Sequence, residues 1–285
     1  MSWRRTTAAS IAWMLLAACG AGGAEVSDRP RVVAAFYPLE FAAQRIGGQA
    51  VDVTGLTPAG VEPHDLELAS DQIRAIAAAD LVVYLGDGFQ PALEDALSDV
   101  DDARRLDALD AVDGSTRDPH VWLDPTLLAQ ITNEIAARLS EVDPDHVDLF
   151  EANAQDLSGD LMDLDRELST GLRDCEARDL VTSHEAFGHL AMRYQLHQVG
   201  ISGIDPEAEP SPQRLAEVAR FVEANDVRTI FFEELAPPDL AETLARETGA
   251  EIAILSPLET APGTGDYIDT MRLNLERLRR ALRCE

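Results

Sequence analysis

The stretch from residue 144 to residue 172 restricts the fold of this 285-residue chain more than any other feature. Few helix-breaking residues interrupt it, and its apolar side chains recur at helical spacing: Val147, Leu149, Phe150, Leu157, Leu161, Leu164, Leu168 and Leu172. At a rise of roughly 1.5 Å per residue, one continuous helix here is about 40 Å long, which is too long for a single small domain. We therefore expect a helix that spans two domains. The alternative is a pair of helices broken at Ser158-Gly159.

Short β-prone runs alternate with helical patterns on both sides of this stretch. The expected strands are 31–36, 51–56, 81–85, 180–182, 199–201, 229–232 and 251–255. Strands that alternate with helices indicate parallel sheets covered by helices. The fold class is therefore α/β, with two (β/α) domains joined by a long rigid helix. Residues 99–118 are acidic and irregular, and we expect an exposed loop there, whereas 185–194 is expected to be helical.

The N-terminus has the pattern of an export signal. Arg4 and Arg5 precede an apolar run at 11–16 that is too short to span a bilayer as a permanent helix. The following Leu16-Ala17-Ala18-Cys19 resembles the bacterial lipoprotein processing box, which implies that Cys19 is acylated. The alternative is an ordinary signal peptide with a chance cysteine. The expected division is 1–18 signal peptide, 19–30 tether, 31–143 N-terminal lobe, 144–174 connecting helix and 175–285 C-terminal lobe.

The charge of the chain narrows the classes of partner. Hydrophobic residues make up 46% of the sequence, which is typical of a globular protein. The net charge of -29 argues against nucleic acid, or an anionic membrane surface, as a binding partner. Genome composition or a salty habitat would also explain this acidity, without any role in function.

Three histidines and one aspartate are candidate metal ligands: His64, His120, His184 and Asp266. Each follows a turn signal or a β-prone run, and two lie on each side of the predicted long helix. Three imidazoles and a carboxylate form a nitrogen-rich set that suits Zn²⁺ better than Mg²⁺ or Ca²⁺. The pattern indicates a metal clamp between two lobes, although each histidine alone is a weak signal.

Other polar residues near these positions have different expected roles. Glu62 and Asp124 are the carboxylates expected to support the ligands, Asp124 by orienting an imidazole. His184 and His189 are separated by five positions, or about 140° around a helix, so they do not form the two-histidine motif of zinc proteases. His189 and His197 are therefore interpreted as structural.

Five ordered segments together resemble the ZnuA/TroA-like substrate-binding proteins of bacterial zinc and manganese ABC importers. They are Gly60-Val61-Glu62-Pro63-His64, Asp118-Pro119-His120-Val121-Trp122-Leu123-Asp124-Pro125, Thr182-Ser183-His184-Glu185-Ala186-Phe187-Gly188, Gly200-Ile201-Ser202 with Glu209-Pro210-Ser211-Pro212, and Gly265-Asp266-Tyr267. The resemblance covers nearly everything after the tether. It implies two small α/β domains joined by a rigid helix, with a metal ion in the cleft between them. It also implies His64 and His120 as ligands from the first domain, and His184 and Asp266 from the second.

The resemblance further implies a function. Manganese receptors of this family often carry Glu at the third ligand position, where zinc receptors carry His, so His184 favours Zn²⁺ over Mn²⁺. Unlike many zinc members, this chain has no histidine in the 99–118 loop. The implied protein is a monomeric receptor, not an enzyme. It is lipid-anchored at the extracytoplasmic face of the bacterial cell membrane and delivers the ion to an ABC permease.

Two other functions remain as alternatives. A zinc hydrolase would need an open coordination position and a general base, for which Glu62 and Glu185 are the candidates. An adhesin, or a Mn²⁺ receptor, would use the same fold with a different ligand or partner.

Export also permits a disulfide, and we expect one between Cys175 and Cys284. Two free buried thiols are the alternative. Since histidines have an unperturbed pKa of about 6.5, metal affinity is expected to be flat above about pH 7.5 and to fall below about pH 6.5.

Overall fold

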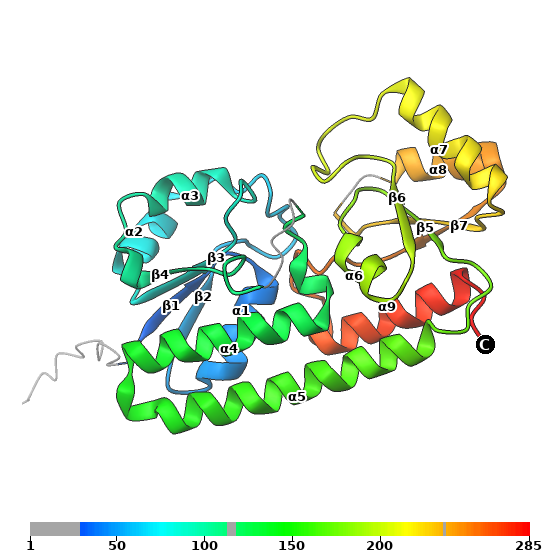
Figure 1. The fold of residues 1–285 in the computed structure, drawn as a ribbon. Coiled ribbons are helices and arrows are strands. Elements are labelled where there is room, and N and C mark those ends of the chain that lie inside the picture. Colours follow the sequence, from blue (N-terminus) through cyan, green and yellow to red (C-terminus); the bar gives the residue numbers. More distant parts are fainter. Residues whose placement is uncertain (1–28, 113–117, 236–237) are drawn as a thin grey trace, which may run out of the picture.

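The first lobe contains a four-stranded parallel sheet with the order β2-β1-β3-β4. The fold was obtained as a computed structural model that describes residues 29–112, 118–235 and 238–285. The strands are β1 (Arg31–Ala34), β2 (Asp52–Gly55), β3 (Leu81–Tyr84) and β4 (Arg105–Asp107). Helices α1 (Tyr37–Gly47), α2 (Ser70–Ala78), α3 (Pro91–Leu97) and α4 (Pro125–Val142) surround the sheet (Figure 1). The predicted signal peptide and Cys19 lie outside the described residues.

The second lobe repeats this topology, with the strand order β6-β5-β7-β8. Its strands are β5 (Asp179–Thr182), β6 (His197–Gly200), β7 (Thr229–Phe232) and β8 (Glu251–Ile254), all parallel. Its helices are α6 (Gly188–Arg193), α7 (Pro212–Ala224), α8 (Asp239–Thr248) and α9 (Tyr267–Ala281). In both lobes the first strand lies between the second and the third. The predicted α/β class with two parallel sheets is confirmed.

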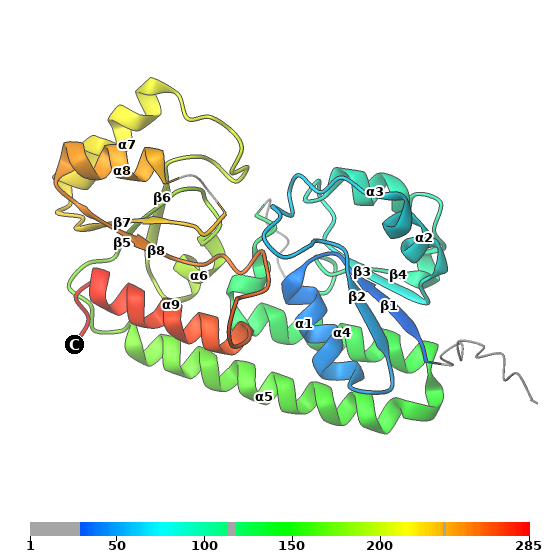
Figure 2. The ribbon, with the colours of Figure 1, turned by 180° about the vertical axis from the view of Figure 1, so that it is seen from behind.

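Helix α5 (Val147–Gly171) is continuous and runs beneath both sheets (Figures 1 and 2). It follows a short 3-10 turn, η3 (Pro144–His146), and at its 25 residues it is about 37 Å long. No break occurs at Ser158-Gly159, because Leu157 and Leu161 continue the buried stripe through that point. Helices α1 and α4 pack on α5 in the first lobe and α9 packs on it in the second, so α5 connects the two lobes rigidly.

The apolar core continues from one lobe to the other. One cluster of buried side chains includes Phe36 from the first lobe, Leu164 from α5, and Phe187 and Tyr267 from the second lobe. A smaller cluster, with Val181 and the side chains under α7 and α8, fills the other face of the second sheet. The shared core explains why the two lobes pack closely against each other.

Two predicted segments differ from the structure. Residues 99–118 are not simply an irregular loop, because η1 (Asp102–Arg104) and the edge strand β4 lie within them. Leu106 is the only buried residue of β4, and one apolar side chain between two charged ones gives no recognisable strand pattern. Helix α6 begins at Gly188 rather than 185, since the residues after β5 form a loop in which the backbone N–H of Glu185 donates to Gly203.

A disulfide bond joins Cys175 to Cys284, the two cysteines expected to pair. Cys175 precedes β5 and Cys284 follows α9, so the bond ties the last helix to the beginning of its own lobe. None of the helices in the described parts of the chain is long and apolar enough to cross a membrane.

Candidate metal centre

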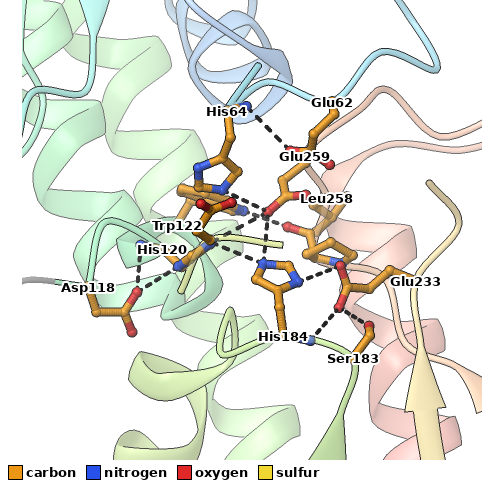
Figure 3. A network of polar contacts seen from close by, with 12 residues as sticks. Glu62, His64, Asp118, His120, Trp122, Ser183, His184, Glu233, Leu258 and Glu259 are labelled. Carbon is orange, nitrogen blue, oxygen red and sulfur yellow. Dashed lines mark hydrogen bonds and ion pairs between the residues drawn. The ribbon is translucent and has the colours of Figure 1, made fainter. Parts of the chain in front are cut away.

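Four side chains converge between the lobes: His64, His120, His184 and Glu259 (Figure 3). One nitrogen or oxygen atom from each lies within 4.8 Å of the others. Along the chain, each of the four follows the end of a strand, namely β2, β4, β5 and β8 in turn. The carboxyl ends of parallel strands meet at one edge of a sheet, which is where α/β proteins commonly bind ligands. The two sheets therefore present these edges to a shared centre.

The spacing of the four ligand atoms is regular. Nε2 of His120 and Nε2 of His184 are 3.4 Å apart. Oε1 of Glu259 is 3.5 Å from each of these nitrogens and 3.7 Å from Nε2 of His64. In a tetrahedral zinc site with bonds of about 2.0–2.1 Å, neighbouring ligand atoms are separated by about 3.3–3.4 Å. These four distances are close to those that a tetrahedral Zn²⁺ site requires.

The centre is shielded from solvent and contains polar atoms without hydrogen-bond partners. His120, His184 and Glu259 are almost completely buried, and the His64 side chain is 12% exposed. Nε2 of His64 and Oε1 of Glu259 have no hydrogen-bond partner among the described residues. Leaving buried polar atoms unsatisfied costs about 1–3 kcal/mol each. Since both atoms face the same point, a bound cation would satisfy them together.

Carboxylates orient two of the imidazoles. Nδ1 of His120 lies 2.7 Å from Oδ1 of Asp118, and Nδ1 of His184 lies 2.7 Å from Oε2 of Glu233. The first contact is a hydrogen bond and the second is an ion-pair contact. Both lie on the Nδ1 side of the ring, which leaves Nε2 facing the centre, as is usual for metal-binding histidines. The sequence analysis did not identify Asp118 or Glu233. Both have a signal in the chain, because Asp118 precedes His120 by two positions and Glu233 directly follows β7.

Charge coupling within the centre is strong. Burial alone would lower the pKa of His184, but Glu233 and Glu259 raise it to about 10. Burial also acts to lower the pKa of His120, and Asp118 with Glu259 nevertheless raises it. For Glu259 burial favours a higher pKa, yet the surrounding imidazoles hold it well below its usual range. Both shifts favour a proton on the imidazoles of His120 and His184 opposite an ionised Glu259.

Asp266 lies outside this group, which corrects the predicted ligand set. It is the N-cap of α9, where its Oδ1 accepts from the backbone N–H of Asp269 at 3.1 Å. Asp269 in turn accepts from the backbone N–H of Asp266. A carboxylate at a helix N-terminus is stabilised by these unpaired backbone donors. Asp266 is therefore occupied in capping, and Glu259 supplies the carboxylate of the centre.

The two expected supporting carboxylates have different surroundings. Glu62 accepts from the backbone N–H of His64, and burial followed by the charge of Glu259 raises its pKa to about 8. Asp124 contacts no imidazole in the described parts of the chain; it caps α4 by accepting from the backbone N–H and the hydroxyl of Thr126. The prediction for Asp124 is therefore wrong.

His189 and His197 lie outside the group of four. His189 contacts the backbone oxygen of Asp118 at 2.9 Å, and His197 contacts Asp179 at 2.9 Å. Both contacts agree with the structural interpretation of these residues.

Comparison with known proteins gives one consistent family. A family model described as "ZnuA: Zinc-uptake complex component A periplasmic" matches residues 32–281. The "High-affinity zinc uptake system protein ZnuA" of Bacillus subtilis is 32% identical in an alignment 312 residues long, which covers 98% of this chain and 98% of that protein. The "Zinc-binding protein AdcA" of Streptococcus pyogenes is 33% identical, but this chain spans only 55% of its length.

Solved structures agree in fold. The laminin-binding protein Lmb of Streptococcus agalactiae, described as bifunctional with adhesin and metal transporting activity, aligns with a TM-score of 0.83 and 35% identity, over 89% of this chain and 99% of that one. The Zn(II)-bound ZnuA-like domain of Streptococcus pneumoniae AdcA aligns with a TM-score of 0.77 and 34% identity, again over 89% and 99%.

Proposed function

We propose that this chain, which belongs to the ZnuA family of zinc-uptake components, is an extracytoplasmic receptor that captures one Zn²⁺ and delivers it to an ABC importer. The observation that carries the proposal is the convergence of three imidazole nitrogens and one carboxylate oxygen within 4.8 Å of one another between the lobes. Two relatives, one named as a zinc uptake protein and one solved with Zn(II) bound, support Zn²⁺ as the ion.

In this proposal His64, His120, His184 and Glu259 are the ligands. Two come from each lobe, so an ion between them joins the lobes. A set of three imidazoles and one carboxylate suits Zn²⁺, whereas Mn²⁺ favours sites richer in oxygen. Mn²⁺ is therefore the less favoured cargo. His64 is the most exposed of the four, which puts it on the side from which an ion arrives.

A hydrolase is disfavoured by the closed ligand set. Catalytic zinc sites keep three protein ligands and a position for water, and here Glu259 would fill that position. Of the two candidate bases, Glu185 lies 3.5 Å from Arg214 and is half-buried. Glu62 is occupied by the backbone N–H of His64. We therefore propose a transport receptor that performs no hydrolysis.

Attachment to the membrane through an acylated Cys19 is part of the proposal. The lipoprotein-like segment Leu16-Ala17-Ala18-Cys19 and relatives named as zinc-binding lipoproteins support it. The protein would then act as a monomer beside its permease on the outer face of the cell membrane. Labelling with a radioactive fatty acid should mark the wild-type chain and leave Cys19→Ala unmarked.

Adhesion is a second candidate, favoured by the similarity to the bifunctional laminin-binding protein. Saturable binding of the zinc-loaded protein to immobilised laminin would add this function, and its absence would leave transport alone.

The direct test is metal analysis of the processed protein purified without added metal, followed by zinc competition with a chelator. We expect one Zn²⁺ per chain and preference over Mn²⁺. Protein that takes up no zinc, or that retains Mn²⁺ more tightly than Zn²⁺, would contradict the proposal.

A further inference from the structure

The segment that carries Glu259 belongs to the second lobe but is hydrogen-bonded to the first on both sides. The indole Nε1 of Trp122 donates to the backbone oxygen of Pro257 at 2.7 Å. The backbone N–H of Gly60 donates to Oγ1 of Thr260 at 2.8 Å. Glu259 lies between these two bonds. One bond begins two residues after His120 and the other four residues before His64, so each connects Glu259 to a loop that carries a histidine of the centre.

Within its own lobe the same segment has little freedom. The amide of Asn274 on α9 accepts from the backbone N–H of Ser256 at 3.0 Å and donates to its oxygen at 2.7 Å. Leu258 is fully buried and has φ +59°, a conformation that costs a non-glycine residue energy and persists only when its surroundings enforce it. The backbone before Glu259 is thus held in one strained arrangement.

Trp122 contacts both halves of the centre. Its ring is buried and lies 5.1 Å from the ring of His120, measured between centroids. Its own backbone oxygen accepts from the hydroxyl of Tyr267 on α9 at 2.6 Å. Figure 3 shows Trp122 beside His120, with Leu258 and Glu259 nearby. A single side chain therefore packs on one ligand and is hydrogen-bonded to the segment of another.

We propose that Trp122 is a positioning residue that fixes the carboxylate of Glu259 opposite the histidines and thereby sets the affinity for the ion. The inference rests on the proposed zinc-binding function. A phenylalanine keeps an aromatic ring at this position but has no N–H to donate to Pro257. Trp122→Phe therefore removes this hydrogen bond together with part of a buried ring, so stability has to be measured beside zinc affinity.

The test is a double-mutant cycle on the processed protein, with Trp122→Phe, Glu259→Gln and the combined variant. Zinc affinity is measured by chelator competition, and stability is measured by thermal unfolding without metal. We expect Trp122→Phe to weaken zinc binding about tenfold, because the Pro257 segment is no longer tied to the first lobe and the Glu259 carboxylate is held less firmly opposite the histidines. In the Glu259→Gln background the same change should have almost no further effect, because Trp122 acts through that carboxylate.

A matched control separates positioning from general loss of stability. Thr132→Val removes another buried hydrogen bond, from Oγ1 to the backbone oxygen of Leu128 on α4, away from the centre. It should lower the unfolding temperature and leave zinc affinity unchanged. The inference is overturned if Trp122→Phe binds zinc as tightly as the wild type, or if Thr132→Val loses as much zinc affinity as Trp122→Phe. It is also overturned if Trp122→Phe weakens zinc binding by the same factor in the Glu259→Gln background as in the wild type. A wild-type protein that binds no zinc would instead overturn the proposed function.

Discussion

Nε2 of His120 and Nε2 of His184 lie 3.4 Å apart, although 64 residues separate them in the chain. The two residues follow strands of different sheets, and helix α5 lies between them in sequence. Their separation equals the nitrogen-to-nitrogen distance of about 3.4 Å expected across a tetrahedral zinc ion. Because α5 is continuous and the lobes share a core, we infer that the centre is formed before the ion arrives.

Glu259 and Asp266 offer the clearest test of the ligand set. We expect Ala at His64, His120 or His184 to weaken zinc binding by orders of magnitude, because each of these changes opens the coordination shell. Glu259→Gln should also weaken binding, since the amide keeps an oxygen but loses the negative charge that faces the ion. Asp266→Asn should leave affinity within a few-fold and cost up to about 1 kcal/mol of stability, since Asn also caps helices. Chelator competition measures the first effect and urea unfolding the second.

His189→Ala is a further control and should bind zinc normally. An Asp266 variant with the larger loss of affinity would restore Asp266 as the ligand.

The carboxylates behind the imidazoles should have a smaller effect than the ligands. Removing such a partner typically weakens metal binding about 10–100-fold, so we expect this range for Glu233→Gln and Asp118→Asn. Asp124→Asn is the matched comparison, because Asp124 caps α4 and contacts no imidazole in the described residues. It should affect stability alone. If Asp124→Asn lost as much zinc affinity as Glu233→Gln, the orientation of the imidazoles by carboxylates would not explain the affinity.

The disulfide should contribute to stability without contributing to binding. Cys175 and Cys284 are separated by 109 positions, and constraining a loop of that length removes about 4–5 kcal/mol of unfolded-state entropy at most. Replacing both by Ser should lower the urea midpoint and preserve zinc affinity. Thiol titration of the denatured, unreduced processed protein should detect no free thiol from this pair. Two reactive thiols would exclude the bond in the exported protein.

The three histidines were predictable because short, recognisable segments surround them. Glu259 was not, although it satisfies the same criterion of following a strand, β8. Its neighbours Pro257 and Thr260 carry no ligand signal, and their bonds to Trp122 and Gly60 depend on the packing of the two lobes. Asp266 was attractive because it follows a glycine turn, but that turn begins α9.

The long helix was predictable from apolar side chains at helical spacing, and the parallel sheets were predictable from strands that alternate with helices. β4 was missed because its single buried residue, Leu106, provides no alternation. Asp118 was assigned to a solvated acidic loop, although it precedes His120 by only two positions and its Oδ1 lies 2.7 Å from Nδ1 of that ring. Local patterns thus located the elements, whereas the position of Glu259 opposite His64 and His120 required the two lobes to be assembled.

The pH dependence should differ from the one that unperturbed histidines would give. With pKa values near 6.5, affinity would level off above about pH 7.5. Here Glu233 and Glu259 raise the pKa of His184 to about 10, and the pKa of His120 is raised as well. A raised pKa keeps the proton bound at neutral pH, so an arriving Zn²⁺ must displace it. Apparent affinity should therefore still be rising between pH 7 and pH 8.

Stability of the metal-free protein should change in the opposite direction. The raised pKa of His184 stabilises the fold fully below its unfolded pKa of about 6.5, and this contribution is lost as pH rises toward 10.

Zinc titrations corrected for the chelator should show that the logarithm of the affinity rises by about one to two units per pH unit. Calorimetry in buffers of different ionisation enthalpy should detect at least about one proton released per ion at pH 7.5. Glu233→Gln should reduce that release, because it removes the carboxylate that holds the proton on His184. A flat affinity from pH 7 to pH 8 without proton release would mean that the histidines are already neutral, and the coupling to Glu233 would have no role in binding.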